Sequence, residues 1–284
     1  MTIAPERGKS VFRKTEKELL RLSSGHRPEA VHGFRTTTRR LQLLLGQLAT
    51  SGQQKNKKLL KMLNRIRKSA GRVRDIDVQL EALRSLKVPQ EPRRKTQLMH
   101  NLLDLRAEYE KRLCKLLKKD DVREIRKRLN RAQQSARFEA GPDPLDVARQ
   151  ILKSANPGSR PFDEATLHRY RILVKRARYA AEFAPNSQES NRFLAELKRL
   201  QDALGTWHDW LTLTNTAIQE LGEVNESSLV AMLINLTRGK FRHALAAVSA
   251  TQAQQTGKQA QKTDAAKKPG RKSTPIGKRT GVAA

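Results

Sequence analysis

The chain has 284 residues and carries 58 lysines and arginines against 28 aspartates and glutamates, a formal net charge of +30. Because such an excess of positive charge attracts polyanions, the partner classes to consider are nucleic acid, an anionic membrane and a polyphosphate-like substrate. The single cysteine, Cys114, excludes an intramolecular disulfide framework, and no stretch approaches the roughly 18 apolar residues of a membrane span, so we expect a cytoplasmic protein without a membrane partner.

The first two predicted helices cover residues 7–22 and about 28–50, with Pro28 suited to the first turn of the second. The second helix has an apolar stripe made of Val31, Phe34, Leu41, Leu44, Leu45 and Leu48. It also carries a basic set made of His32, Arg35, Arg39 and Arg40. The sequence therefore predicts a helix that packs with one side and presents cations with another.

A third helix is predicted over residues 53–70, with Gly71 breaking it. Cations recur along it at i, i+4, i+7 and i+11, within about 60° of arc, at Lys61, Arg65, Lys68 and, if the helix extends so far, Arg72. A solvated helix face usually interleaves glutamate with lysine, and this stripe has no glutamate. Asp75 suits the first turn of the next helix, where a carboxylate meets the positive end of the helix dipole.

The next helix is predicted to end near Lys87, and helices at about 93–119 and 122–136 complete the first half. Residues 141–144 read Gly-Pro-Asp-Pro, and this density of proline and glycine breaks any helix. They mark the boundary between the two halves of the chain. A short helix to about Ala155 follows.

Residues 167–183 form the second signature helix, whose packing side is made of Leu167, Tyr170, Leu173, Val174, Ala177 and Ala181. Its basic side is made of His168, Arg171, Lys175 and Arg178. Cations so close together repel one another unless an anion sits among them, so this side is a candidate anion site. Tyr179 lies about 20° from His168 on the helix, and its hydroxyl could donate to a phosphate oxygen.

Helices at about 188–204, 206–222 and 226–250 repeat the order of the first half, and no segment shows strand-like alternation. The sequence therefore predicts an all-α protein. Residues 251–284 have eight lysines and arginines against one aspartate and almost no large apolar residue, so we expect a disordered basic tail. The tail holds +7 of the charge and leaves +23 on residues 1–250.

Two motifs recur in the same order along the chain. The pattern H-x-x-R-x-x-x-[RK]-R occurs within residues 31–41 and again, 136 residues later, within 167–177. Residues 63–75 align in turn with residues 197–209, so the distance from histidine to glycine is 39 residues in the first copy and 37 in the second. This repetition predicts a duplicated unit, with halves at about 7–140 and 145–250.

The two basic helices, the run Lys-Arg-Leu-Gln-Asp-Ala-Leu-Gly at residues 198–205, and the elements Arg-Asp-Ile-Asp at 74–77 and His-Asp at 208–209 resemble the CHAD family, the conserved histidine α-helical domain. The resemblance covers about residues 7–250. It implies two pseudo-symmetric antiparallel helical bundles whose basic faces meet at a central groove or channel that binds inorganic polyphosphate. It also implies association with polyphosphate granules.

The candidate polyphosphate-binding residues come from both copies: His32, Arg35, Arg39, Arg40, Lys61, Arg65, Lys68, Arg72, His168, Arg171, Lys175, Arg176, Arg178, Tyr179, Lys198 and Arg199. The copies also differ, since Gln42 stands where the second copy has Arg178, and unequal contributions are expected. His32 and His168 suit phosphate contact or helix-to-helix hydrogen bonding equally. We assign structural roles to the other histidines, His26, His100, His208 and His243.

Three functions from different classes fit the sequence. The first is polyphosphate binding, and the second is an RNA- or DNA-binding helical protein, which the charge alone supports equally well. The third is a phosphohydrolase, but metal-assisted phosphate chemistry needs clustered carboxylates. The nearest acidic pairs are Glu16 with Glu18, on a helical pattern, and Asp75 with Asp77. We therefore predict no catalytic residue, no metal site and no cofactor.

Overall fold

The computed structural model describes residues 3, 5–48, 53–88, 91–138, 141–155, 162–222 and 227–266. Within these ranges the chain is helical and contains no β-strand, which confirms the all-α prediction. The elements in order are α1 (Pro5–Ser24), α2 (Pro28–Leu43), a short π-helix η1 (Leu44–Leu48), α3 (Gln53–Ser85), α4 (Pro92–Cys114), α5 (Lys119–Ser135), α6 (Pro144–Ala155), α7 (Glu164–Ala181), α8 (Gln188–Leu221) and α9 (Ser228–Ala266).

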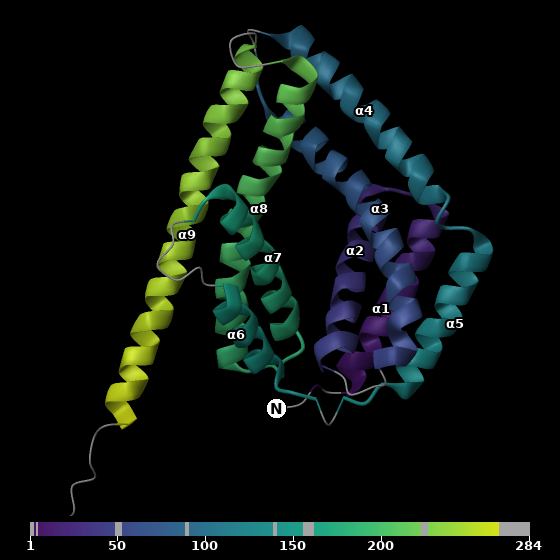
Figure 1. Ribbon diagram of the computed structural model, residues 1–284, viewed down its shortest axis with the longest axis vertical. Helices are drawn as coiled ribbons and strands as arrows, with labels where there is room; N and C mark the ends of the chain where they lie inside the picture. The colour runs from purple at the N-terminus through teal and green to yellow at the C-terminus, as the bar shows by residue number, and fades with distance from the viewer. Residues whose placement is uncertain are drawn as a thin grey trace, which may run out of the picture.

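The helices form two groups that lie side by side (Figure 1). One group contains α1, α2, α5 and the first part of α3, and the other contains α6, α7, the first part of α8 and the middle of α9. The two signature helices, α2 and α7, face each other at the centre and are in contact. The second parts of α3 and α8 continue beyond these groups and meet α4 and the start of α9.

Two apolar cores hold this arrangement together. The larger core joins both groups, with Phe12 and Phe34 from the first half and Leu167 and Trp207 from the second, all fully buried. The smaller core lies where the four longest helices meet, and includes Leu83 of α3. The packing faces predicted for α2 and α7 are therefore the buried faces.

The two glycines predicted to end helices do not end them. Helix α3 runs for 33 residues through Gly71, and α8 runs for 34 residues through Gly205. A mid-helix glycine costs only about 1 kcal/mol relative to alanine, which packing on both sides readily offsets. At Gly71 an added Cβ would lie 3.6 Å from the Arg35 Cζ, an ordinary van der Waals contact, so the glycine marks a close neighbour and not a helix end. Asp75 is consequently in mid-helix, and the prediction that it caps a helix is wrong.

Other boundaries also differ from the predicted ones. Helix α2 passes at Leu43 into the π-helix, and α4 ends at Cys114 rather than near residue 119. Helix α9 continues to Ala266, so residues 251–266 are helical where we expected a disordered tail. Residues 267–284 of that predicted tail lie outside the described residues.

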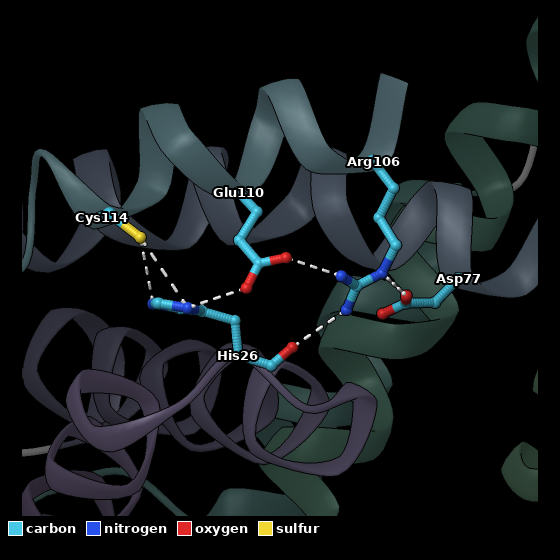
Figure 2. A network of polar contacts seen from close by, with 5 residues as sticks. All are labelled: His26, Asp77, Arg106, Glu110 and Cys114. Atoms are coloured by element: carbon cyan, nitrogen blue, oxygen red, sulfur yellow. Dashed lines mark hydrogen bonds and ion pairs between the residues drawn. The ribbon is translucent and has the colours of Figure 1, made fainter. Parts of the chain in front are cut away.

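A partly buried ion-pair network anchors the connection between α1 and α2 to α3 and α4 (Figure 2). The Arg106 guanidinium donates to Asp77 Oδ1 at 2.7 Å, to Glu110 Oε2 at 2.7 Å and to the His26 carbonyl at 3.0 Å. The His26 ring lies 3.1 Å from the second Glu110 oxygen. Because Asp77 is 8% exposed and paired with Arg106, its carboxylate holds α3 against α4. The structural reading of His26 fits this placement.

Candidate functional site

Four helices bring charged side chains together at the centre of the molecule. Helices α2 and α7 contribute the predicted basic residues, and α3 and α8 contribute others beside them. We call this group the central cluster: His32, Arg35, Arg39, Arg67, Arg74, Asp75, His168, Arg171, Lys175, His208 and Asp209. Each member interacts electrostatically with members from other helices.

Two ion pairs occupy equivalent positions in the two halves. The Arg35 guanidinium donates to Asp75 Oδ1 at 3.1 Å and to the Gly71 carbonyl at 2.7 Å. The Arg171 guanidinium lies 3.8 Å from Asp209 Oδ1. The two arginine side chains are 15% and 13% exposed, whereas Asp75 is 60% exposed. The repeated motif therefore produces the same arginine–aspartate contact twice, although the duplication itself stays a prediction.

Positive charge outweighs negative charge in the central cluster. Five arginines and Lys175 face only two aspartates, and Arg39 and Arg74 have no ion-pair partner among the described residues. The Nε atoms of Arg67 and Arg171 are buried and make no hydrogen bond within the described part of the chain. Buried donors are normally paired. An anion that accepts from these guanidinium groups would satisfy both the charge and the hydrogen bonds.

The pKa of Lys175 is strongly lowered in this positively charged and buried environment. Burial, together with Arg171 and Arg39, lowers the pKa of its ammonium group from 10.5 to about 7, while Asp209 opposes the change. Burial also lowers the pKa of Arg35 and of Arg171, but a guanidinium keeps its proton at neutral pH. Lys175 is thus the cation of the central cluster whose charge changes near physiological pH.

The histidines of the central cluster are held in their neutral forms. Burial and then Arg171 lower the pKa of His208 to about 3, and the His208 ring lies 4.8 Å from the His168 ring. Burial, followed by neighbouring cations, also lowers the pKa values of His32 and His168. We expected His208 to be an ordinary structural residue, but the structure places it inside the central cluster. A neutral imidazole there can both donate and accept a hydrogen bond.

Three predicted site residues form a separate contact beside the central cluster. Arg40 donates to Glu182 at 2.7 Å and Arg178 donates to the same carboxylate at 2.8 Å. Both guanidinium groups lie over the Tyr179 ring, at 5.7 Å and 6.0 Å from its centroid. Tyr179 is only 8% exposed and belongs to the larger core, rather than standing on an open basic side as we expected. This contact links α2 to the end of α7.

The cationic stripe of α3 lies on a different side of that helix. Lys61, Arg65, Lys68 and Arg72 are exposed, and Arg72 lies over the ring of Tyr109 in α4, 5.8 Å from its centroid. Within the described residues, none of the four is among the charges that shift the pKa values of the central cluster. The structure therefore does not bring the stripe to the site for which we predicted it.

The remaining predicted residues also lie away from the central cluster. Arg176 is exposed on α7, Arg199 is exposed on α8, and Lys198 pairs with Asp202 at 2.6 Å one helical turn away.

Sequence analysis missed Arg67 and Arg74, the residues of α3 that do reach the central cluster. They are seven residues apart and so fall within about 20° on a helix, beside Asp75. The predicted helix break at Gly71 assigned Arg67 and Arg74 to different helices, so their shared face was not recognised. A continuous helix through Gly71 would have placed them on one face with the carboxylate. The alignment of Asp75 with Asp209 was a signal for that face.

The described residues offer neither a metal site nor a membrane span. No group of three or more histidine, cysteine, aspartate or glutamate side chains there is placed to share a metal ion. No described helix combines the length and apolar character that crossing a membrane requires.

Comparisons with known proteins agree with this architecture. Residues 9–217 match the family described as CHAD domain. The fold is similar to the crystal structure of the CHAD domain from the plant Ricinus communis, with 19% identity, a TM-score of 0.56, and coverage of 83% of this chain and 84% of that one. It is also similar to PptA from Streptomyces chartreusis, with 17% identity, a TM-score of 0.61, and coverage of 88% and 98%. No functionally curated protein matches the chain.

Proposed function

Because the chain belongs to the CHAD domain family, we propose that it binds inorganic polyphosphate at the central cluster. The observation that carries the proposal is the surplus of half-buried guanidinium groups on three helices, α2, α3 and α7, including the equivalent residues Arg35 and Arg171. Polyphosphate is a flexible line of negative charge without base edges, so its receptor needs closely spaced arginine forks and ammonium groups. The central cluster supplies these.

The side-chain chemistry favours polyphosphate over nucleic acid. Proteins that bind single-stranded nucleic acid combine cations with aromatic rings on which bases stack. Trp207, whose ring centroid lies 6.2 Å from that of His208, is fully buried and so is not open to stack on a base. RNA or DNA binding remains the alternative function that bare positive charge supports.

The two halves contribute unequally to the proposed site. The positions of Arg67 and Arg74 in the first copy correspond to Gln201 and His208 in the second. His208 is neutral at physiological pH, since its pKa is lowered to about 3 by burial and then by Arg171. The first half therefore supplies more of the charge that holds phosphate groups.

The proposed role is binding without catalysis, in a reducing cytoplasm and in association with polyphosphate granules, as the family resemblance implies. Release of orthophosphate from polyphosphate by the purified chain with added divalent metal would contradict the first part. Failure of a fluorescently tagged chain to colocalise with granules in polyphosphate-rich cells would contradict the second.

The variant that tests the binding site is Arg39→Gln with Arg74→Gln. Neither residue has an ion-pair partner in the described structure, so helix content should not change. A hydrogen bond to a charged group contributes about 1.5–3 kcal/mol, so we expect at least a ~10-fold loss of affinity for long-chain polyphosphate. The matched control is Arg192→Gln with Arg238→Gln, which removes two exposed cations from α8 and α9. Equal losses in both variants would overturn the assignment of the site.

A further inference from the structure

Arg65, one of the exposed cations of α3 that do not reach the central cluster, lines a separate cavity. It has a volume of about 260 Å³ and is lined by residues from α3, from α5 and from the connection between α4 and α5. The lining residues are Met62, Arg65, Ile66, Lys115, Leu116, Lys118, Asp121 and Ile125. This volume is many times the roughly 30 Å³ that one water molecule occupies in the liquid.

Three of the lining side chains are cations with no ion-pair partner. Arg65, Lys115 and Lys118 come from two different parts of the chain, and none forms an ion pair within the described residues. Lys61 and Lys68 extend the charge along α3, because residues three and four apart are neighbours on a helix surface. Such a gathering of unpaired cations around a concave surface raises the local concentration of anions.

The start of α5 borders the same cavity, where Lys118 and Asp121 line it. Lys118 is the N-cap of this 17-residue helix and provides no side-chain hydrogen bond to it, so the first backbone N–H groups are left without a capping acceptor. Asp121, in the first turn of α5, is the only acidic residue that lines the cavity and offsets one of the three positive charges. The net charge of the residues that line the cavity remains positive, and a phosphate oxyanion would neutralise it.

We propose that this cavity is a second phosphate-binding site, distinct from the central cluster, which takes short inorganic polyphosphate or a segment of a longer chain. Arg65 and Lys118 bind the phosphate oxygens, and Lys115 closes the edge of the site. The floor is apolar, with Ile66 3% exposed and Ile125 fully buried, so the cationic heads rather than the floor determine what binds. The site does not depend on whether the central cluster binds polyphosphate.

Met62 provides a local reporter for the test. The chain contains four methionines, and Met62 is the one that lines this cavity, while Met99 lies against the smaller core and Met232 lines a cavity on α9. The full-length protein is labelled with ¹³C in its methionine methyl groups, and Met62→Leu assigns the resonance, because this swap conserves volume. Sodium tripolyphosphate and long-chain polyphosphate are titrated at physiological salt, with sodium chloride of equal ionic strength as the reference.

We expect the Met62 resonance to shift saturably with phosphate, beyond any shift of Met99 and Met232. The variant with Arg65, Lys115 and Lys118 all changed to glutamine should lose at least ~10-fold in affinity at this site, since three charge-assisted contacts are removed. The control with Arg192, Arg238 and Arg242 changed to glutamine, which removes equal charge elsewhere, should keep the shift.

If tripolyphosphate shifts the Met62 resonance at a lower phosphate concentration than long-chain polyphosphate does, the ligand of this site is a free short anion. The opposite order identifies the ligand as a segment of a longer chain. The Arg39→Gln, Arg74→Gln variant separates this proposal from the proposed function, because it should lose binding at the central cluster and keep the Met62 shift. A Met62 resonance that moves no more than with sodium chloride would overturn the second site. So would a shift that persists in full after the three cavity cations are removed.

Discussion

The pKa of Lys175 makes polyphosphate binding depend on pH in a specific window. In the free protein this pKa is about 7, lowered by burial, Arg171 and Arg39. A bound polyanion offsets the repulsion from these arginines and raises the pKa again, so above pH 7 binding takes up a proton. Affinity should therefore fall as pH rises from about 7 towards 10.5. Below pH 7 Lys175 is already charged and contributes no pH dependence.

The size of the effect follows from the shift in pKa. Restoring the pKa from about 7 to its ordinary 10.5 corresponds to on the order of 5 kcal/mol, which is the upper limit of the pH-dependent gain. At pH 8 a group with a pKa near 7 is about nine-tenths unprotonated, so binding should take up about 0.9 proton per site. His32 and His168 have lowered pKa values and titrate below this window.

Calorimetry in two buffers of different ionisation enthalpy measures the proton uptake directly at pH 8. Long-chain polyphosphate is the ligand, because its few end groups contribute little titration of their own. Lys175→Arg is the control, since arginine keeps its charge and Arg39 already occupies the equivalent position in the first half. Uptake near zero in the wild-type protein, or equal uptake in the Lys175→Arg variant, would refute the assignment of Lys175 to the site.

Two predictions concern stability. Asp77→Ala removes one of the two carboxylates that Arg106 contacts at 2.7 Å, so the unfolding free energy should drop by about 1.5–3 kcal/mol in chemical denaturation. A loss below 1 kcal/mol would show that Glu110 alone suffices. Gly205→Ala should stabilise the protein by about 0.5–1 kcal/mol, because nothing lies within 4 Å of an added Cβ. Gly8→Ala should destabilise it, since the added Cβ would lie 2.5 Å from the Phe138 ring. Thermal melts that rank the two variants in the opposite order would refute this reasoning.

Periodicity was enough to predict the helical architecture. The apolar residues of α2 and α7 recur at helical spacing, and Phe34, Leu41, Leu167 and Val174 are indeed fully buried. The arginines of the two H-x-x-R motifs, Arg35 and Arg171, both lie in the central cluster, and their role as binding residues stays a prediction. Burial of an apolar stripe fixes the orientation of a helix, so the residues opposite or beside the stripe follow from it.

The faces of α3 and α8 were harder to predict. Both helices contact partners on several sides, and α3 carries cations on two different faces. From residue spacing alone, the stripe through Arg65 and the face with Arg67 and Arg74 are equally good candidates for the site. Only the packing of α3 against α2 and α8 determines which of the two faces the centre. The glycine rule also failed at Gly71 and Gly205, both of which lie within continuous helices.

Charge pattern alone could not reveal which cations are already paired. Arg40 and Arg178 share Glu182, and Lys198 is held by Asp202. The Lys198 pair could be read from i, i+4 spacing, but the Arg40 pair joins positions 142 residues apart and depends on the contact between the two halves. Long-range pairing of this kind is a property of the fold.

The most direct test of the account is a competition titration at physiological salt. Labelled long-chain polyphosphate bound to the full-length protein is displaced by RNA, by duplex DNA or by unlabelled polyphosphate, with all competitors compared at equal phosphate concentration. Because the central cluster offers guanidinium forks and no stacking platform, unlabelled polyphosphate should displace the label while RNA and DNA displace little. Displacement by RNA at the same phosphate concentration as polyphosphate would contradict the account and make the chain a general polyanion binder.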